Sequence, residues 1–110
     1  MDYPPGVFVS RTSTEQWQPD PGVPGTEMHE LVHSDGVWAG LIRMTSVDGP
    51  IPWTPDQRET AVVLEGRVRI EFDDGTSLEL GPGDMASFAP GTAMTWHVTA
   101  PFKELWVLAG

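Results

Sequence analysis

Residues 67–80 read RVRIEFDDGTSLEL. Charged and apolar side chains alternate over residues 67–72, which is the period of two typical of a strand with one buried face and one wet face. The letters DDG at 73–75 are a hairpin-turn sequence, and residues 76–80 supply the returning strand. The stretch therefore predicts an antiparallel β-hairpin.

Further short strands are predicted on both sides of this hairpin. Short, mostly apolar runs separated by turn residues occupy residues 36–45, 59–64, 85–88, 93–99 and 103–108. Gly (12) and Pro (11) are together too frequent for a helical protein, and no run has the pattern of a long helix. We therefore predict an all-β sandwich or barrel.

Composition narrows the classes of function. The 110 residues suit one domain, and 16 Asp+Glu against 6 Lys+Arg give a formal net charge of −10. Nucleic acids and anionic membranes are bound through Lys and Arg, so we expect neither as a partner and interpret the charge as ordinary solubility. The absence of cysteine excludes disulfides, thiolate ligands and a thiol nucleophile. With no long apolar run and no signal-peptide pattern, we expect a cytoplasmic protein.

Residues 29–33 read HELVH, which matches the H-E-x-x-H pattern of zinc hydrolases. The pattern works only on a helix, where both imidazoles share one face and the Glu between them acts as general base. Turn residues at 24–25 and 34–36 leave little room for a helix, so we predict a strand. On a strand His29 and His33 share one face, and a different metal site there is the open alternative. We favour two surface histidines.

Residues 1–26 are rich in proline and irregular. They carry apolar side chains that a small barrel has little room to bury, namely Tyr3, Val7, Phe8, Val9 and Trp17. We expect residues 1–26 to form an arm that packs on the barrel or on a partner subunit, and residues 27–110 to form a single barrel domain. Because added strands also protect a sheet edge, we expect a homodimer.

Two motifs lie within residues 49–110. Residues 59–66 read ETAVVLEG and lead through the hairpin to the GPGD turn at 81–84. Residues 83–98 read GDMASFAPGTAMTWHV, with GD, Pro-Gly and Trp in this order. Together these motifs resemble those of the cupin family. Within the family, the chain is similar to the small cupins of the (S)-ureidoglycine aminohydrolase and ethanolamine-utilisation type. The resemblance implies a double-stranded β-helix, a jelly-roll barrel of two antiparallel sheets around a pocket.

The resemblance also implies a metal site, but of the usual ligands this sequence keeps only the glutamate. Many cupins place two histidines shortly before the motif glutamate, here Glu59, and a third shortly after the second Pro-Gly. This chain has Trp53 and Pro55 before Glu59, and Met94 after the Pro-Gly. A lone carboxylate is a poor ligand set for a transition metal, so we predict no bound metal. The alternative is a divalent transition metal on an unusual ligand set drawn from Glu59, His97, His29 and His33.

Strand alternation decides which side chains line the implied pocket. Regular alternation points Met94 and Trp96 inward and His97 outward, whereas a bulge would turn His97 inward. We favour the outward position for His97, and we expect Trp53, Met94 and Trp96 to line a mostly apolar pocket around Glu59. Such a pocket suits a small organic ligand with an apolar body and one polar or cationic group.

Burial in that pocket would raise the pKa of Glu59 and make it an acid or base near neutral pH. Arg43 is a candidate ligand-binding residue and counter-charge. A structural role, in which Glu59 pairs with Arg43 or Arg58, carries equal weight. For Trp38 and Trp106 we prefer core packing.

The leading hypothesis is a small-molecule-binding cupin with a degenerate metal site. In it, the pocket either only binds the molecule, or Glu59 also catalyses an isomerase, cyclase or lyase step by acid–base chemistry without a metal. Two alternatives remain, because the fold alone says little about chemistry. One is a metal-dependent enzyme with a Glu/His ligand set, and the other is a non-catalytic sensor or interaction domain.

Overall fold

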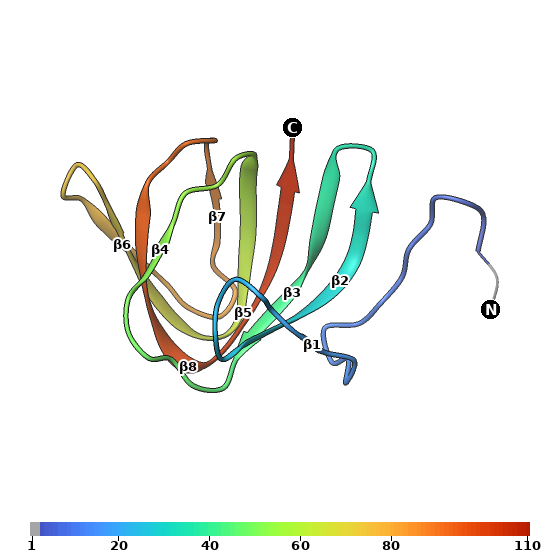
Figure 1. Ribbon diagram of the computed structural model, residues 1–110, viewed down its shortest axis with the longest axis horizontal. Coiled ribbons are helices and arrows are strands. Elements are labelled where there is room, and N and C mark those ends of the chain that lie inside the picture. The colour runs from blue at the N-terminus through green and yellow to red at the C-terminus, as the bar shows by residue number, and fades with distance from the viewer. Residues whose placement is uncertain (1–2) are drawn as a thin grey trace.

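The computed structural model describes residues 3–110, and the regular secondary structure there is entirely β (Figure 1). The strands are β1 (Gln18–Pro19), β2 (Thr26–Ser34), β3 (Val37–Met44), β4 (Ile51–Trp53), β5 (Arg58–Phe72), β6 (Ser77–Leu80), β7 (Met85–Phe88) and β8 (Met94–Ala109). The predicted all-β fold is confirmed, and the HELVH stretch lies in strand β2 rather than in a helix. Over this part of the chain, no helix has the length and apolar character needed to cross a membrane.

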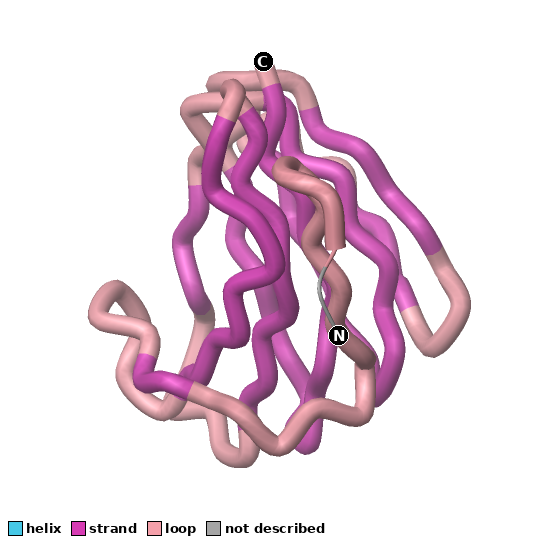
Figure 2. The backbone as a smooth tube through the Cα atoms, turned by 90° about the vertical axis from the view of Figure 1, so that its right-hand side faces the viewer, coloured by secondary structure: helices cyan, strands magenta, loops and turns pink. Residues whose placement is uncertain are grey.

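The two long strands β5 and β8 form the centre of the fold. They pair antiparallel from Arg58 opposite Ala109 to Phe72 opposite Met94. Strands β3, β2 and β1 extend the sheet beyond β8, and β6 extends it beyond β5. The first half of β5 also pairs with β7, and the first half of β8 with β4. Because each long strand has different neighbours in its two halves, the sheet curves into two layers with a concave inner side (Figures 1 and 2). The predicted jelly-roll barrel is confirmed.

Gly66 lets β5 change direction between its two halves. The register with β8 shifts on both sides of Glu65. Gly66 has a φ of 80°, and a Cβ at this position would collide with the carbonyl oxygen of Pro101 on β8. The prediction of two separate strands over residues 59–64 and 67–72 is wrong, because the glycine bends the strand without ending its pairing. Strand β8 likewise unites two predicted strands.

The alternating stretch 67–72 places its apolar side chains on the concave side, as the sequence predicts. Val68 and Ile70 are 2% and 0% exposed, whereas Arg69 and Glu71 are exposed on the outer side. The buried core cluster on the concave side consists of Met44, Val63, Val68, Ile70, Leu80, Phe88, Met94, Trp96 and Phe102. Full burial of one such side chain contributes about 1.5–3 kcal/mol, so this cluster holds the two layers together.

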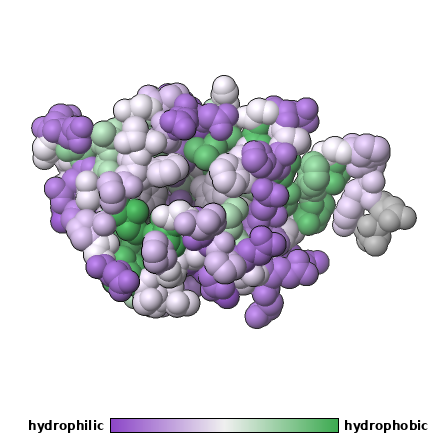
Figure 3. All heavy atoms as spheres, in the orientation of Figure 1, coloured by the Kyte–Doolittle hydropathy of each residue, from purple (hydrophilic) through white to green (hydrophobic). Residues whose placement is uncertain are grey.

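The N-terminal arm lies against the outer, convex side of the barrel. Residues 8–12 line a groove with Ala39 and Leu41 of β3, which are only 6% and 5% exposed. The Lys103 ammonium group donates a hydrogen bond to the carbonyl oxygen of Thr12 at 3.1 Å. Hydrophobic side chains are visible at the surface beside the N-terminal end of the chain (Figure 3). The described part of the arm therefore covers apolar sheet surface but leaves some of its own apolar groups in solvent.

A glycine in β3 allows β2 and β3 to approach closely. A Cβ at Gly40 would collide with the carbonyl oxygen of His29 on β2. We predict that Gly40→Ala lowers the free energy of unfolding by about 1–3 kcal/mol, because the added methyl forces paired backbones apart. Urea unfolding measures the effect.

The control is Gly22→Ala, where the added methyl would meet only the side chain of Asp20. We expect this control to stay within about 0.5 kcal/mol of wild type, as surface substitutions usually do. Equal stabilities of the two variants would contradict the close approach of β2 and β3.

Candidate functional site

Two glutamates project into the concave side of the barrel. Glu59 lies at the start of β5 and Glu104 in the second half of β8, and they are 6% and 1% exposed. Glu104 is directly opposite Val63 on β5, and Glu59 lies four residues before Val63. Because side chains of one strand alternate between faces, both carboxyl groups share the face of the buried Val63. The fold therefore brings together two acidic groups that are far apart in the sequence.

Trp53 on β4 holds the Glu59 carboxyl group. The indole Nε1 of Trp53 donates a hydrogen bond to Oε1 of Glu59 at 2.6 Å. Burial raises the pKa of Glu59, and the hydrogen bond from Trp53 opposes this by favouring the charged form. Trp53 itself is 40% exposed, so it lies between Glu59 and solvent. Glu59 is thus a buried, oriented acid or base.

Glu104 is the more deeply buried of the two acids. Burial raises its pKa well above the ordinary value, and the negative charge of Glu59 raises it further. Its Oε2 atom has no hydrogen-bond partner among the described residues. A buried carboxyl group without a counter-charge favours its neutral form, so Glu104 retains a proton at pH values where exposed glutamates have lost theirs.

Aromatic rings flank the two carboxyl groups on the concave side. Trp106 lies two residues after Glu104 on the same face, is 8% exposed, and has an indole Nε1 without a partner among the described residues. Trp38 packs edge-on against Trp106 with ring centroids 5.1 Å apart. His33 stacks on Trp38 at 4.7 Å. The result is an acidic site with an aromatic wall.

Sequence reasoning missed Glu104, although a signal for it was present. The run Phe102, Glu104, Trp106 occupies alternate positions of one strand. A charged residue between two large aromatic residues on the same strand face is out of place on a surface and indicates a buried acid.

Two of the other predicted lining residues lie deep in the core. Met94 and Trp96 face the concave side and are 4% and 5% exposed. Trp96 packs against Phe88 with ring centroids 6.2 Å apart, and its indole Nε1 has no partner in the described part of the chain. Of the residues proposed to surround Glu59, only Trp53 forms a hydrogen bond with it over residues 3–110.

Arg43 does not provide the expected counter-charge. It lies opposite Lys103 on the convex side, pairs with Glu27 at 3.0 Å, and its guanidinium lies 4.4 Å from the Trp17 ring centroid. The alternative partner Arg58 also points outward. The prediction that Arg43 faces the pocket is wrong, because its position on β3 alternates with the inward-facing ones.

Residues His29 and His33 lie on opposite faces of β2. A bulge between Glu30 and Val32 shifts the register, so that His29 is opposite Leu41 on the convex side and His33 is opposite Trp38 on the concave side. The prediction of a shared face is wrong, because the bulge adds one residue to the alternation.

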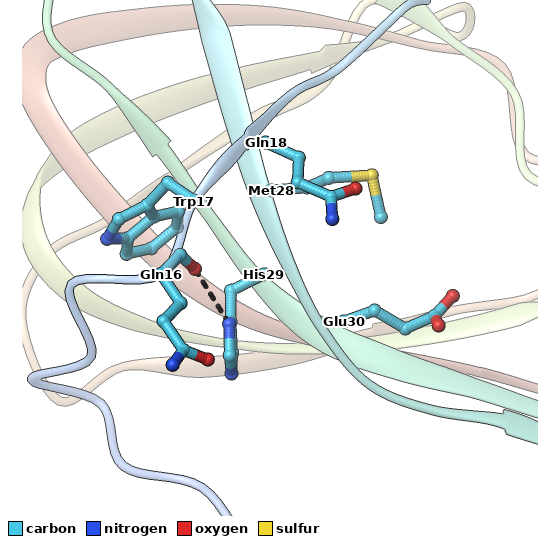
Figure 4. A pocket seen from close by; sticks show the side chains of 6 residues that line it. All are labelled: Gln16, Trp17, Gln18, Met28, His29 and Glu30. Atoms are coloured by element: carbon cyan, nitrogen blue, oxygen red, sulfur yellow. Dashed lines mark hydrogen bonds between the residues drawn. The ribbon is translucent and has the colours of Figure 1, made fainter.

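His29 instead fastens the arm. Its Nδ1 lies 2.8 Å from the carbonyl oxygen of Gln16 (Figure 4). Its Nε2 lies 2.7 Å from Oγ of Ser10. The open hollow in that figure, about 500 Å³, lies between β1 and β2 and is separate from the two buried carboxyl groups.

His97 points outward, as regular alternation predicts. It lies opposite Arg69. Its Nε2 is 2.6 Å from Oε1 of Glu71, although the approach does not have the geometry of a hydrogen bond. The Arg69 guanidinium donates a hydrogen bond to Oε1 of Glu71 at 2.8 Å, and this bond and the positive charge lower the pKa of Glu71. His97 therefore lies on the opposite side of the sheet from Glu59.

These positions do not fit the histidine metal site of many cupins. In residues 3–110 no group of three or more His, Cys, Asp or Glu side chains could hold a metal ion. The indole of Trp53 and the thioether of Met94 stand where imidazoles would be needed, and neither is a strong donor to a divalent metal.

Comparison with known proteins relates the fold to a family. The model of the EutQ-like cupin domain matches residues 39–104, a range that includes both Glu59 and Glu104. No protein of curated function matches the chain.

Solved structures share the fold at low identity. The ethanolamine utilization protein Q of Salmonella typhimurium LT2 is 20% identical with a TM-score of 0.70, over 84% of this chain and 77% of that one. The EutQ protein of Clostridium difficile is 20% identical with a TM-score of 0.68, over 84% and 69% of the two chains. KdgF from Halomonas sp. is 18% identical with a TM-score of 0.72, over 96% and 94%. Likenesses this distant show the fold alone.

The burial of Glu104 predicts a pH dependence of stability. Its pKa is higher in the folded protein than the ordinary value of 4.5, so the folded state binds this proton more tightly than the unfolded state. The free energy of unfolding therefore falls as pH rises from the ordinary pKa toward the raised one. Glutamine mimics the protonated acid, so we predict that Glu104→Gln loses less stability than wild type between about pH 5 and about pH 8.

Urea unfolding at the two pH values measures this difference. The matched control is Glu79→Gln on β6, where the glutamate is exposed, and this variant should follow wild type. A Glu104→Gln variant that loses as much stability as wild type would contradict a neutral, buried Glu104.

Proposed function

Because the chain belongs to the EutQ-like cupin domain family, we propose that it binds a small organic molecule on the concave side of its barrel and that Glu59 transfers a proton there without a metal. The observation that carries this proposal is the buried Glu59 carboxyl group, held through Oε1 by the Trp53 indole. The hydrogen bond engages only one of the two carboxyl oxygens, which leaves Oε2 to take or give a proton.

The environment of Glu59 suits acid–base chemistry. A general base works best when its pKa is near the working pH, and burial moves the pKa of Glu59 in that direction. The hydrogen bond from Trp53 limits the rise and fixes the orientation of the carboxylate. Removal of a proton from carbon next to a carbonyl group, and its return to another atom, gives an isomerase, cyclase or lyase step in which Glu59 is regenerated.

Proton transfer at Glu59 can be tested before the substrate is known. In D₂O, Glu59 should catalyse exchange of acidic C–H protons in small carbonyl compounds that bind the site, and proton NMR follows the loss of signal. We predict that Glu59→Gln lowers the exchange rate by about 10²–10⁴, the usual contribution of a positioned acid or base.

Trp53→Phe serves as the second variant. It keeps an aromatic ring but removes the donor to Glu59, so it should raise the pKa of Glu59 and move the pH profile of exchange to higher pH. The control is Glu79→Gln, which lies exposed on β6. Compounds that bind but exchange equally fast with wild type and Glu59→Gln would favour the alternative of a non-catalytic sensor domain.

The outer side of the barrel supports a second proposal, that two copies of the chain form a homodimer. Val7, Phe8 and Val9 of the arm are 46%, 53% and 61% exposed, and Met85 on β7 is 74% exposed. The groove that the arm leaves over β3 and β8, about 340 Å³, is lined mainly by apolar side chains. Apolar surface of this kind is commonly covered by a partner, and the identical surface of a second copy would match it.

The cytoplasmic location of the protein stays a prediction.

Sedimentation equilibrium tests the homodimer. We expect a dimer at micromolar concentration, and we expect Phe8→Asp to shift it to monomer because it puts a charge into the apolar contact. The matched control is Ser13→Asp, which also adds a charge to an exposed part of the arm. A wild-type chain that sediments as a monomer at micromolar concentration would contradict the proposal.

A further inference from the structure

Two acidic side chains lie inside the barrel, whereas the basic side chains lie outside it. The concave side holds the buried carboxyl groups of Glu59 and Glu104. The chain contains 6 Lys and Arg residues, all within the described range, and every one lies on the arm or the outer side: Arg11, Arg43, Arg58, Arg67, Arg69 and Lys103. An anionic ligand would therefore meet two acids and no cationic side chain inside the barrel, which costs free energy through like-charge repulsion.

Three buried side chains on the concave side of β8 have a polar atom without a partner among residues 3–110. One is Trp96, deep in the core, and the other two, Glu104 and Trp106, lie two residues apart. Oε2 of Glu104 accepts no hydrogen bond, and Nε1 of Trp106 donates none, although these side chains are 1% and 8% exposed. Buried polar groups are nearly always hydrogen-bonded, so unpartnered ones on the same face of one strand indicate a ligand. Oε2 of Glu104 requires a donor, and Nε1 of Trp106 requires an acceptor elsewhere on the same ligand. The face of the indole ring also attracts a cation.

We propose that the site's ligand carries an ammonium group, which binds Glu104 against the ring of Trp106. This inference rests on the proposed function, because it names the class of molecule bound in the same site. An ammonium group supplies three N–H donors, and a charge-assisted hydrogen bond to a carboxylate is about twice as strong as a neutral one. Glu59 lies on the same face, two residues before Ala61, which is opposite Trp106.

Binding of the ammonium group displaces the proton of Glu104. The neutral carboxyl group loses H⁺ to solvent, and the resulting carboxylate pairs with the ammonium ion, so charge and atoms balance. The other titratable groups on the concave side are Glu59 on β5 and Glu30 and His33 at the edge of β2. Because a proton leaves, the affinity for an ammonium ligand rises with pH over the range in which Glu104 is protonated.

Three probes of nearly equal shape test the charge preference, namely isobutylammonium, isobutanol and isobutyrate. Isothermal titration calorimetry of the wild-type chain should detect binding of isobutylammonium with affinity at least about tenfold above that of isobutanol, and no binding of isobutyrate. Titrations in two buffers of different ionisation enthalpy should show proton release with isobutylammonium only. Equal affinity for isobutanol, a preference for isobutyrate, or no binding of isobutylammonium would each overturn the proposal.

Glu104→Gln separates recognition from mere folding. This variant keeps the shape of the protonated acid, so it should still fold, but it should bind isobutylammonium at least about tenfold more weakly and release no proton. Glu79→Gln, the exposed control on β6, should bind as wild type does. Undiminished binding by Glu104→Gln would overturn the assignment of Glu104.

Failure of this inference and failure of the proposed function give different results. Isobutylammonium has no acidic C–H group, so its binding does not depend on proton transfer by Glu59. Binding of isobutylammonium without catalysed C–H exchange of any compound would retain the ligand class and reject the acid–base role. Glu59-dependent exchange by a protein that does not bind isobutylammonium would do the reverse.

Discussion

The antiparallel pairing of β5 with β8 supports both layers of the barrel and also builds its site. Each strand contributes one half to each layer, and Gly66 provides the bend that lets the pairing continue between the halves. The same register sets Glu104 opposite Val63, on the face that Glu59 shares. A slip of one residue would turn the side chains of one of the two strands to the other face, and its carboxyl group and apolar residues would leave the concave side. The core and the acidic site therefore depend on one register.

Burial of two carboxyl groups without a cationic side chain opposes folding. An isolated charge in an apolar interior is unfavourable, and such groups respond by binding a proton. Here the two acids differ in their surroundings, since Glu59 receives a hydrogen bond from Trp53 and Glu104 has an oxygen without a partner in the described part of the chain. Pairs of acids whose environments separate their pKa values are typical of sites that move protons. Stability alone does not explain why the fold buries both carboxyl groups, so we attribute their burial to function.

Part of this structure can be predicted from the sequence. Alternation over residues 67–72 and after Met94 is regular, so it predicts the hairpin, the inward Trp96 and the outward His97. The local sequence pattern predicts the wrong face for a side chain where a bulge interrupts the register of the strand. The bulge in β2 places His29 and His33 on opposite faces of the strand, and no residue of the HELVH stretch indicates a bulge. The sequence pattern predicts separate strands over residues 59–64 and 67–72. They form one bent strand, because Gly66 with its φ of 80° lies between them instead of a turn.

The candidate site is less predictable than the fold, because it depends on which strands become neighbours. Glu59 can be found from its motif, and Trp53 from its position six residues earlier. Arg43 was misplaced because its face is decided by pairing with β8, which the local sequence does not specify. Glu104 was missed because it is distant from Glu59 in sequence, although its place between Phe102 and Trp106 indicated burial.

The most direct test of the account is a carbon NMR titration of the side-chain carboxyl groups, with Glu59→Gln and Glu104→Gln used to assign the signals. We predict that Glu104 keeps its proton well above the ordinary pKa of 4.5 and that the midpoint of its titration falls in Glu59→Gln, where the neighbouring charge is gone. We also predict a raised midpoint for Glu59. Independent titration of both groups near the ordinary value would contradict a pair of buried, interacting acids on the concave side.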